Sequence, residues 1–90
     1  MNLQAKDKKG RPIQTGDWVR LVEIPAQVTP SEPDTYRIFQ LALGKTFRIE
    51  SFGEFGHAEL NVSHKVEKYH WIWVEPQCLL RSHRSRRKRA

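Results

Sequence analysis

Apolar and polar residues alternate along several short stretches of the chain, and a period of two is the pattern typical of β-strands. The first stretch, residues 18–24, follows a Thr-Gly-Asp turn at 15–17. Alternation places Val19 and Leu21 on one face of this strand. Because Arg20 on the opposite face prefers water, we expect Val19 and Leu21 to face the core.

Three later stretches repeat this pattern. Residues 45–52 and 57–62 predict two strands, joined by a short hairpin loop at 53–56 that has a glycine at each end. Residues 70–75 predict a fourth strand. The apolar residues expected to face the core are Phe47, Ile49, Ala58, Leu60, Val62, Ile72 and Val74.

The segment between the first two strands does not alternate. Residues 25–34 contain three prolines and predict a long, stiff loop. Residues 35–43 predict a short helix, with Asp34 as its N-cap and Gly44 as its C′ residue. The apolar stripe expected to cover the end of the β-structure consists of Tyr36, Phe39 and Leu43.

These elements predict a single all-β domain of about five short strands. The domain is expected to span residues 10–80 and to close with one 3-10 turn at 76–80. Residues 1–9 are polar and predict a flexible N-terminus. Residues 81–90 have no apolar residue before Ala90 and predict a disordered basic tail.

Four motifs mark the starts and ends of the predicted strands. They are Asp7-x-x-Gly10-x-x-Ile13-x-x-Gly16-Asp17-x-Val19, Leu43-Gly44-Lys45-x-Phe47-x-Ile49, Gly56-x-Ala58-x-Leu60 and Trp73-Val74-Glu75-Pro76-x-x-Leu79. With these motifs the chain resembles the SH3-like, KOW-like small β-barrels of short bacterial proteins over residues 7–80. The resemblance implies an SH3-like barrel in which residues 25–43 take the place of the long first loop. It implies no single function, because such barrels host many unrelated roles.

Charge is distributed unevenly along the chain. The sequence has 16 Lys and Arg against 10 Asp and Glu, a formal net charge of +6. The last ten residues carry six of these bases and no acid, so the first 80 residues carry ten of each sign. The domain is therefore expected to be neutral. The high isoelectric point belongs to the tail and does not by itself indicate a nucleic-acid-binding domain.

Cysteine content and hydropathy bear on the compartment. Cys78 is the only cysteine, which allows no internal disulfide and fits a reducing environment. The first residues lack the apolar run of a signal peptide, and the longest apolar run, 71–74, is too short to span a membrane. We therefore expect a cytoplasmic monomer without membrane contact.

Candidate catalytic and metal-binding groups are sparse. The serines lie outside any nucleophile motif, and no two acids can be placed as a general acid and base. Cys78 and a histidine would make a thiol nucleophile, but a lone cysteine is more often a small buried residue. The histidines, which lack metal-ligand spacing, are His57, His64, His70 and His83. We expect no enzyme, cofactor or metal, and we keep a thiol- or metal-dependent enzyme using Cys78, His57 or His70 as a weaker alternative.

Three tryptophans are expected to point away from the core. Trp71 and Trp73 are out of phase with the core residues of their strand, and Trp18 is out of phase in the first strand. A shared exposed aromatic patch would mark a partner site. The alternative is that residues 25–43 cover the three rings and form a second small core.

Basic residues are the other candidate binding groups. Arg20 and Arg48 are expected beside the tryptophan rings, where they would suit stacking on bases or cation–π contacts. Arg-rich segments bind phosphates through charge and bidentate geometry, although the tail can equally be a solvated end that aids solubility. The tail residues expected to bind are Arg84, Arg86, Arg87, Lys88 and Arg89.

Together these features favour a non-enzymatic small binding module. The leading hypothesis is an accessory protein that contacts nucleic acid, ribonucleoprotein or another polyanion through the tail and the tryptophan face. The alternative is a protein–protein adaptor in which the tryptophan face binds and the tail is incidental.

Overall fold

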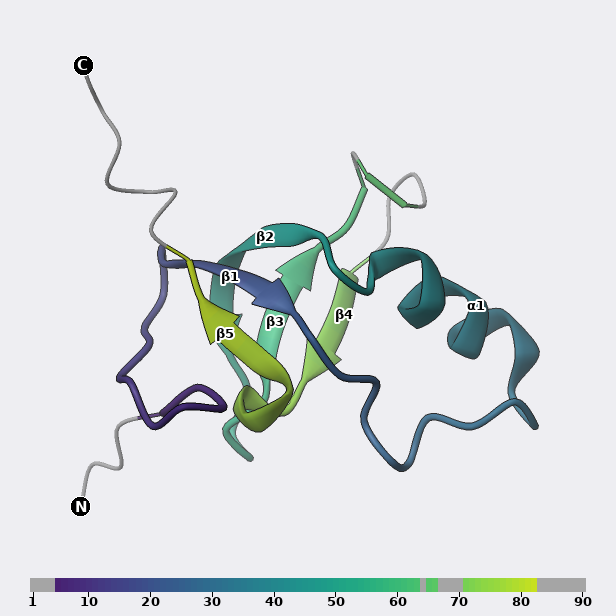
Figure 1. Cartoon of the computed structure of the whole chain (residues 1–90), viewed down its shortest axis with the longest axis horizontal. Coiled ribbons are helices and arrows are strands. Elements are labelled where there is room, and N and C mark those ends of the chain that lie inside the picture. Colours follow the sequence, from purple (N-terminus) through teal and green to yellow (C-terminus); the bar gives the residue numbers. More distant parts are fainter. Residues whose placement is uncertain (1–4, 64, 67–70, 83–90) are drawn as a thin grey trace.

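Five short antiparallel strands form one sheet, and a single helix lies beside it (Figure 1). The computed structural model describes residues 5–63, 65–66 and 71–82. Its elements are β1 (Trp18–Leu21), α1 (Pro33–Ala42), β2 (Thr46–Phe52), β3 (Ala58–Asn61), β4 (Trp71–Val74), the 3-10 turn η1 (Pro76–Cys78) and β5 (Leu79–Arg81). The sheet order is β4-β3-β2-β1-β5. The prediction of a mostly β domain with one helix and a closing 3-10 turn is confirmed.

The strands form where the alternation predicts them, because each one buries a single set of side chains. Along β2, Phe47 and Ile49 are buried while Arg48 and Glu50 are exposed. All of the predicted inward residues of the strands are buried in one core. The core residues are Ile13, Val19, Leu21, Ile38, Phe39, Ala42, Phe47, Ile49, Ala58, Leu60, Val62, Ile72, Val74, Cys78 and Leu79.

Helix α1 begins earlier than predicted. Its first residue is Pro33, which suits a helix start because it has no backbone N–H to leave unpaired and its φ is already helical. The N-cap is therefore Glu32 and not Asp34, and no side chain caps this end. Asp34 instead lies in the first turn, where its negative charge stabilises the helix by interacting with the positive end of the helix dipole.

The buried face of α1 also differs from the predicted stripe. Ile38, Phe39 and Ala42 are buried, whereas Tyr36 is only partly buried and Leu43 is exposed. Leu43 has left the helix, with ψ at 129°, so it no longer follows the helical period. Gly44 has a φ of +86°, which confirms its predicted role after the helix end. Within the described residues no helix is long and apolar enough to cross a membrane.

The N-terminal segment is anchored to β5 by residues that lie outside the predicted domain of residues 10–80. Asp7 is buried, and its carboxylate accepts a hydrogen bond of 2.7 Å from the Arg81 N–H. The Lys8 N–H donates to the Leu79 carbonyl at 2.8 Å. A buried carboxylate thus joins residue 7, within the predicted flexible segment 1–9, to residue 81, the first residue of the predicted tail 81–90. Residues 1–4 and 83–90 lie outside the described residues.

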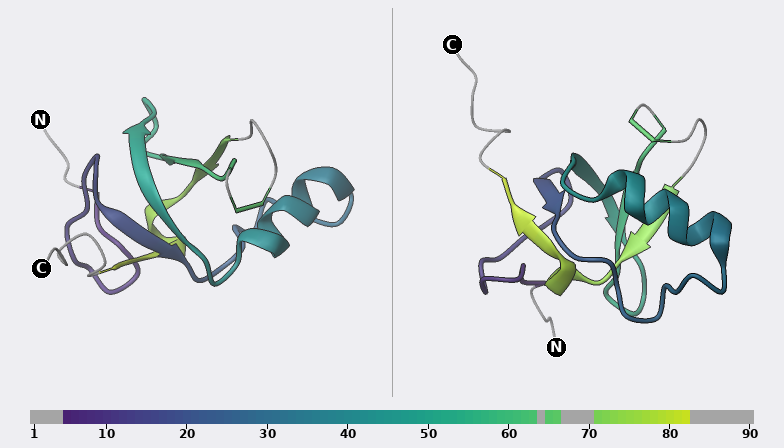
Figure 2. Two further views of the ribbon diagram at one scale, coloured as in Figure 1. Left: turned by 90° about the horizontal axis from the view of Figure 1, so that it is seen from above. Right: turned by 45° about the vertical axis from the view of Figure 1, so that its right-hand side comes forward.

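The sheet is open, which corrects the prediction of a closed β-structure. In the part of the chain that the structure describes, β4 and β5 are its two edges and do not pair with each other. The outer edge of β5 is instead taken by the N-terminal turn through Lys8 and Asp7. Figure 2 shows the consequence for shape, with α1 and the N-terminal turn at opposite ends of the sheet.

Candidate binding surfaces

The three tryptophans belong to two different surfaces. Trp71 and Trp73 lie on β4, one edge of the sheet, and are 45% and 48% exposed. Trp18 lies on β1, which β2 and β3 separate from β4, and it is partly buried. The predicted outward direction of Trp71 and Trp73 is therefore confirmed. The expected patch shared by all three rings is wrong, because the sheet order places two strands between them.

A largely apolar groove of about 570 Å³ runs beside Trp71 and Trp73. We call it the tryptophan groove. Its lining comes from the loop after β1, from α1, from the β2–β3 turn and from β4. The lining residues are Pro25, Gln27, Val28, Thr35, Phe39, Gly53, Glu54, Phe55, His57, Trp71, Ile72 and Trp73.

The segment 25–43 forms one wall of this groove. Val28 and Phe39 line it, yet both tryptophans remain about half exposed. Glu75 helps to hold the wall, since its Oε2 accepts a hydrogen bond from Gln27 Nε2 at 3.1 Å. The alternative in which residues 25–43 cover the rings is thus wrong for Trp71 and Trp73, because the loop packs beside the rings and not over them.

The opposite wall depends on the turn between β2 and β3. A Cβ at Gly53 would lie 3.0 Å from Cζ3 of Trp73, so the ring rests against a position where only hydrogen fits without displacement. Phe55, in the same turn, is 83% exposed and lines the groove. Trp73 thereby gains a defined position while one side of its ring remains in solvent.

Acidic groups lie in and next to the tryptophan groove. Glu54 lines it directly, and Glu59 lies opposite Trp73 in the β3–β4 register. His57 lines the groove as well, with its Nε2 at 3.9 Å from Glu75 Oε2. No Lys or Arg is among the described residues that line it.

The predicted arginines lie on the outer face of β1 and β2 and not beside this groove. Trp18 is opposite Arg48 in the β1–β2 register, and Arg20 is opposite Thr46. Directly opposed residues point to the same face, so Trp18, Arg20 and Arg48 share one surface. Lys65 adds a further cation there, with its Nζ 5.8 Å from the centre of the Trp18 ring.

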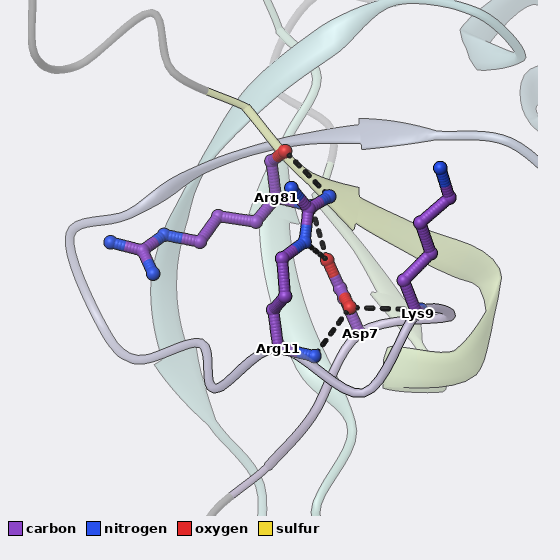
Figure 3. A network of polar contacts seen from close by, with 4 residues as sticks. All are labelled: Asp7, Lys9, Arg11 and Arg81. Atoms are coloured by element: carbon purple, nitrogen blue, oxygen red, sulfur yellow. Dashed lines mark hydrogen bonds and ion pairs between the residues drawn. The ribbon is translucent and has the colours of Figure 1, made fainter.

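A second hollow, of about 350 Å³, is lined by basic residues at the β5 edge. We call it the basic hollow. Its cationic lining residues are Lys9, Arg11, Arg20 and Arg81, and the others are Thr46, Leu80 and Ser82. Figure 3 shows that the Arg81 side chain points away from Lys9, on the far side of Arg11. Arg81 also lines a neighbouring hollow with Pro12, Gln14 and Asp17.

Asp7 organises the basic hollow from beneath (Figure 3). Its Oδ1 accepts hydrogen bonds from the backbone N–H groups of Lys9 and Arg11, both at 2.9 Å. Its Oδ2 accepts from Arg11 Nε at 3.1 Å and from the Arg81 N–H at 2.7 Å. Arg11 Nη2 in turn donates to the Arg81 carbonyl at 3.3 Å.

These contacts keep the Asp7 carboxylate ionised. Burial alone would raise the pKa of Asp7, but the hydrogen bonds from Arg81, Arg11 and Lys9 and the charge of Arg11 outweigh burial. The pKa of Asp7 therefore lies below its ordinary value. Asp7 is thus a fixed anion that holds three basic residues of the surface in place.

The candidate chemical groups stay apart in the described part of the chain. Cys78 is 4% exposed, and burial, together with the charges of Glu23 and Glu75, raises the pKa of its thiol to about 11. No three potential metal ligands gather among the described residues. His64, His70, His83 and the bases at 84 and 86–89 lie outside the described residues, so the weaker alternative of an enzyme using His70 stays untested.

Sequence reasoning missed two kinds of site residue. Phe39 and Phe55 line the tryptophan groove, and the exposed hairpin position of Phe55 was the available signal. The sequence does not single out Lys9 and Arg11, because the first 80 residues carry equal numbers of bases and acids. A balanced count does not show where positive and negative side chains cluster on the folded surface. The available signal was an acid, Asp7, at the start of the same turn motif.

Comparisons of the chain with known protein families, with curated proteins and with solved structures found no match.

Proposed function

We propose that this chain is a non-enzymatic binding module with an SH3-like fold built on an open sheet, and that its tryptophan groove holds an extended, apolar segment of a partner protein. The observation that carries the proposal is the exposure of Trp71, Trp73 and Phe55 along one groove of about 570 Å³. Large contiguous apolar surfaces of monomers are often functional, and tryptophan is enriched among the residues that dominate binding energy.

The connectivity of the strands supports the fold assignment. Consecutive strands β1 to β4 are neighbours, and β5 returns to pair with β1 after the turn η1. The longest connection, which contains α1, lies between β1 and β2. A long first connection at residues 25–43 is the feature that the resemblance to SH3-like barrels implies.

The charges around the groove favour a polypeptide over a nucleic acid as its occupant. A nucleic-acid strand brings one phosphate charge per nucleotide, and those charges are met by Lys and Arg in its binding sites. The groove offers Glu54 and the neighbouring Glu59 in their place. An apolar segment of a protein brings no such charge, and a basic residue on it would be attracted.

The high pKa of Cys78 supports the non-enzymatic part of the proposal. A thiol with a pKa of about 11 is almost wholly protonated at neutral pH, whereas the thiolate is the nucleophile. Cys78 is also buried in the core beside β5 and is not among the residues that line the tryptophan groove. Its environment is that of a packing residue.

The proposal can be tested by selecting random peptides on phage against the full chain. We expect the selected peptides to lose at least tenfold in affinity on Trp73→Ala, because that ring is a central groove contact. Leu41→Ala is the matched control, since Leu41 is 43% exposed but does not line the groove. Peptides that bind the Trp71→Ala, Trp73→Ala double variant as tightly as the native chain would contradict the proposal.

A second candidate function, contact with nucleic acid, is supported on a different face. The basic hollow gathers Lys9, Arg11 and Arg20 at the edge of the sheet opposite to β4. The module would then bind two kinds of partner on two separate surfaces.

A further inference from the structure

We propose that the basic hollow binds the phosphate groups of a nucleic-acid strand, with Lys9, Arg11 and Arg20 as the contacting residues. The hollow measures about 350 Å³ and has no acid among its described lining residues. This site is independent of the tryptophan groove, so the failure of one proposal leaves the other standing.

The hollow is built and not an accident of surface lysines. Asp7, whose side chain is fully buried, fixes the backbone of Lys9 and Arg11 through its Oδ1. The same carboxylate holds Arg11 Nε, and the Arg81 carbonyl accepts a further bond from Arg11 Nη2. A guanidinium positioned on two sides loses little freedom when an anion arrives, which favours binding.

The positive charge of the hollow is only partly neutralised. Arg11 shares its charge with Asp7 but keeps N–H donors that neither Asp7 nor the Arg81 carbonyl uses. Within residues 5–63, 65–66 and 71–82, no carboxylate forms an ion pair with the side chain of Lys9 or Arg20. A phosphate in the hollow would therefore meet Lys9 and Arg20 without a competing acid, together with the Arg11 donors that Asp7 does not use.

The arrangement of the remaining groups favours a nucleic-acid strand over a lipid surface. Arg48 lies on the same outer face as Arg20, which extends the basic surface along β1 and β2. The sequence continues from Ser82, which lines the hollow, into five more bases. Membrane-binding surfaces combine such charges with exposed apolar residues, but Leu80, the apolar residue of this hollow, is half-buried.

The direct test is the binding of a labelled single-stranded RNA of about 12 nucleotides to the full chain, followed by anisotropy from about 50 to 200 mM salt. The slope of log K against log salt is negative, and loss of one phosphate contact makes it shallower by about 0.7. The same loss lowers the affinity at about 0.1 M salt by about fivefold. We expect this change for Arg20→Gln and about twice the change in slope for the Lys9→Gln, Arg20→Gln double variant.

Arg37→Gln is the matched control, because Arg37 is an exposed arginine of α1 that does not line the hollow. We expect it to leave the slope unchanged. Equal effects of Arg20→Gln and Arg37→Gln, or no effect of either, would overturn the proposal.

Replacement of the bases at 84 and 86–89 by Gln removes the contribution of the tail to RNA binding. The effect of Arg20→Gln on the slope must persist in that background. Binding of phosphatidylserine vesicles without binding of RNA would also overturn it.

Asp7→Asn provides a readout that total charge alone does not explain. Removing an acid raises the net charge of the chain, so simple attraction predicts tighter RNA binding. The built hollow predicts weaker binding, because Arg11 loses its partner on Asp7. The comparison is made where circular dichroism shows the variant to be folded, and tighter binding there would contradict the positioning role of Asp7.

Discussion

At the residue scale, Asp7 connects stability with surface geometry. It is the one polar residue buried among those that the structure describes, and it accepts four hydrogen bonds from Lys9, Arg11 and Arg81. A buried carboxylate is stable only when its lone pairs are matched in this way. Asp7 therefore joins the N-terminal turn to β5, although the two segments are far apart in the sequence.

We predict that Asp7→Asn lowers the free energy of unfolding by about 2–4 kcal/mol at pH 7, because the amide cannot accept all four bonds. Urea unfolding measures this change. The surface control is Glu23→Gln, which breaks the exposed ion pair with Lys8 and should have a much smaller effect. Equal losses in the two variants would contradict the role given to Asp7.

The same carboxylate predicts how stability depends on pH. The pKa of Asp7 is lowered in the folded protein, so its contribution is fully present above the unfolded pKa of about 3.9. The contribution is lost as the pH falls through the lower folded pKa. The free energies of unfolding of the native chain and of Asp7→Asn should therefore differ by a constant amount from pH 7 down to about pH 4. Below about pH 4 the two values should converge. A difference that is already lost near pH 6 would contradict this prediction.

Gly53 tests how the tryptophan groove is shaped at a single position. Gly53→Ala places a methyl group 3.0 Å from the Trp73 ring, so the ring must move. We expect a shifted Trp73 indole signal by NMR and weaker binding of selected peptides. Gly56→Ala is the control, because its added Cβ has no neighbour within 4 Å and so does not displace Trp73. Its φ of +85° strains the alanine backbone by about 1–2 kcal/mol, so this variant changes stability without touching the ring. Loss of peptide affinity in Gly56→Ala alone would contradict the prediction.

At the element scale, the strands could be predicted from the sequence and the helix only in part. Alternation fixed the inward residues of β1 to β4 because one face of each strand is buried. Helix α1 begins two residues before the predicted start, because Pro33 fits a proline-rich loop and a first helical position equally well by sequence. β5 was not predicted as a strand, because three residues show no period and the pairing of Leu79–Arg81 depends on distant partners.

The uncapped start of α1 offers a stabilising substitution. Glu32 is the N-cap and makes no side-chain hydrogen bond to the helix. Serine at this position would accept a bond from a free N–H of the first turn, so Glu32→Ser should raise the free energy of unfolding by about 0.5–1 kcal/mol. Thermal unfolding measures the change. Glu32→Ala is the control and should not stabilise the protein, and equal stabilisation by both substitutions would contradict the capping explanation.

At the scale of the whole molecule, a neutral charge count conceals a separation of charge. The first 80 residues carry ten bases and ten acids, yet the tryptophan groove is bordered by Glu54 and Glu59 while the basic hollow is lined by Lys9, Arg11 and Arg20. The sequence could predict exposed Trp71 and Trp73 from strand phase. It could not predict that Trp18 lies apart from them, because that follows from the order of the strands in the sheet.

The separation of the two surfaces predicts different salt dependences. Binding of an apolar peptide in the tryptophan groove should change little from about 50 to 200 mM salt, because few charges are paired. Binding of RNA should weaken steeply over the same range, with a slope that falls when Arg20 is replaced. Anisotropy with both probes on the full chain measures the two slopes. Equal slopes would indicate one shared site and contradict two separate surfaces.

The central claim is that the tryptophan groove and the basic hollow bind different partners. The chain has three tryptophans, so NMR spectra contain three indole N–H signals, which single Trp→Phe variants assign. The most direct measurement titrates the full chain with a selected peptide and separately with single-stranded RNA. We predict that the peptide shifts the signals of Trp71 and Trp73 and that RNA leaves these two unchanged. RNA that shifts Trp71 and Trp73, or a bound peptide that shifts neither, would contradict the account.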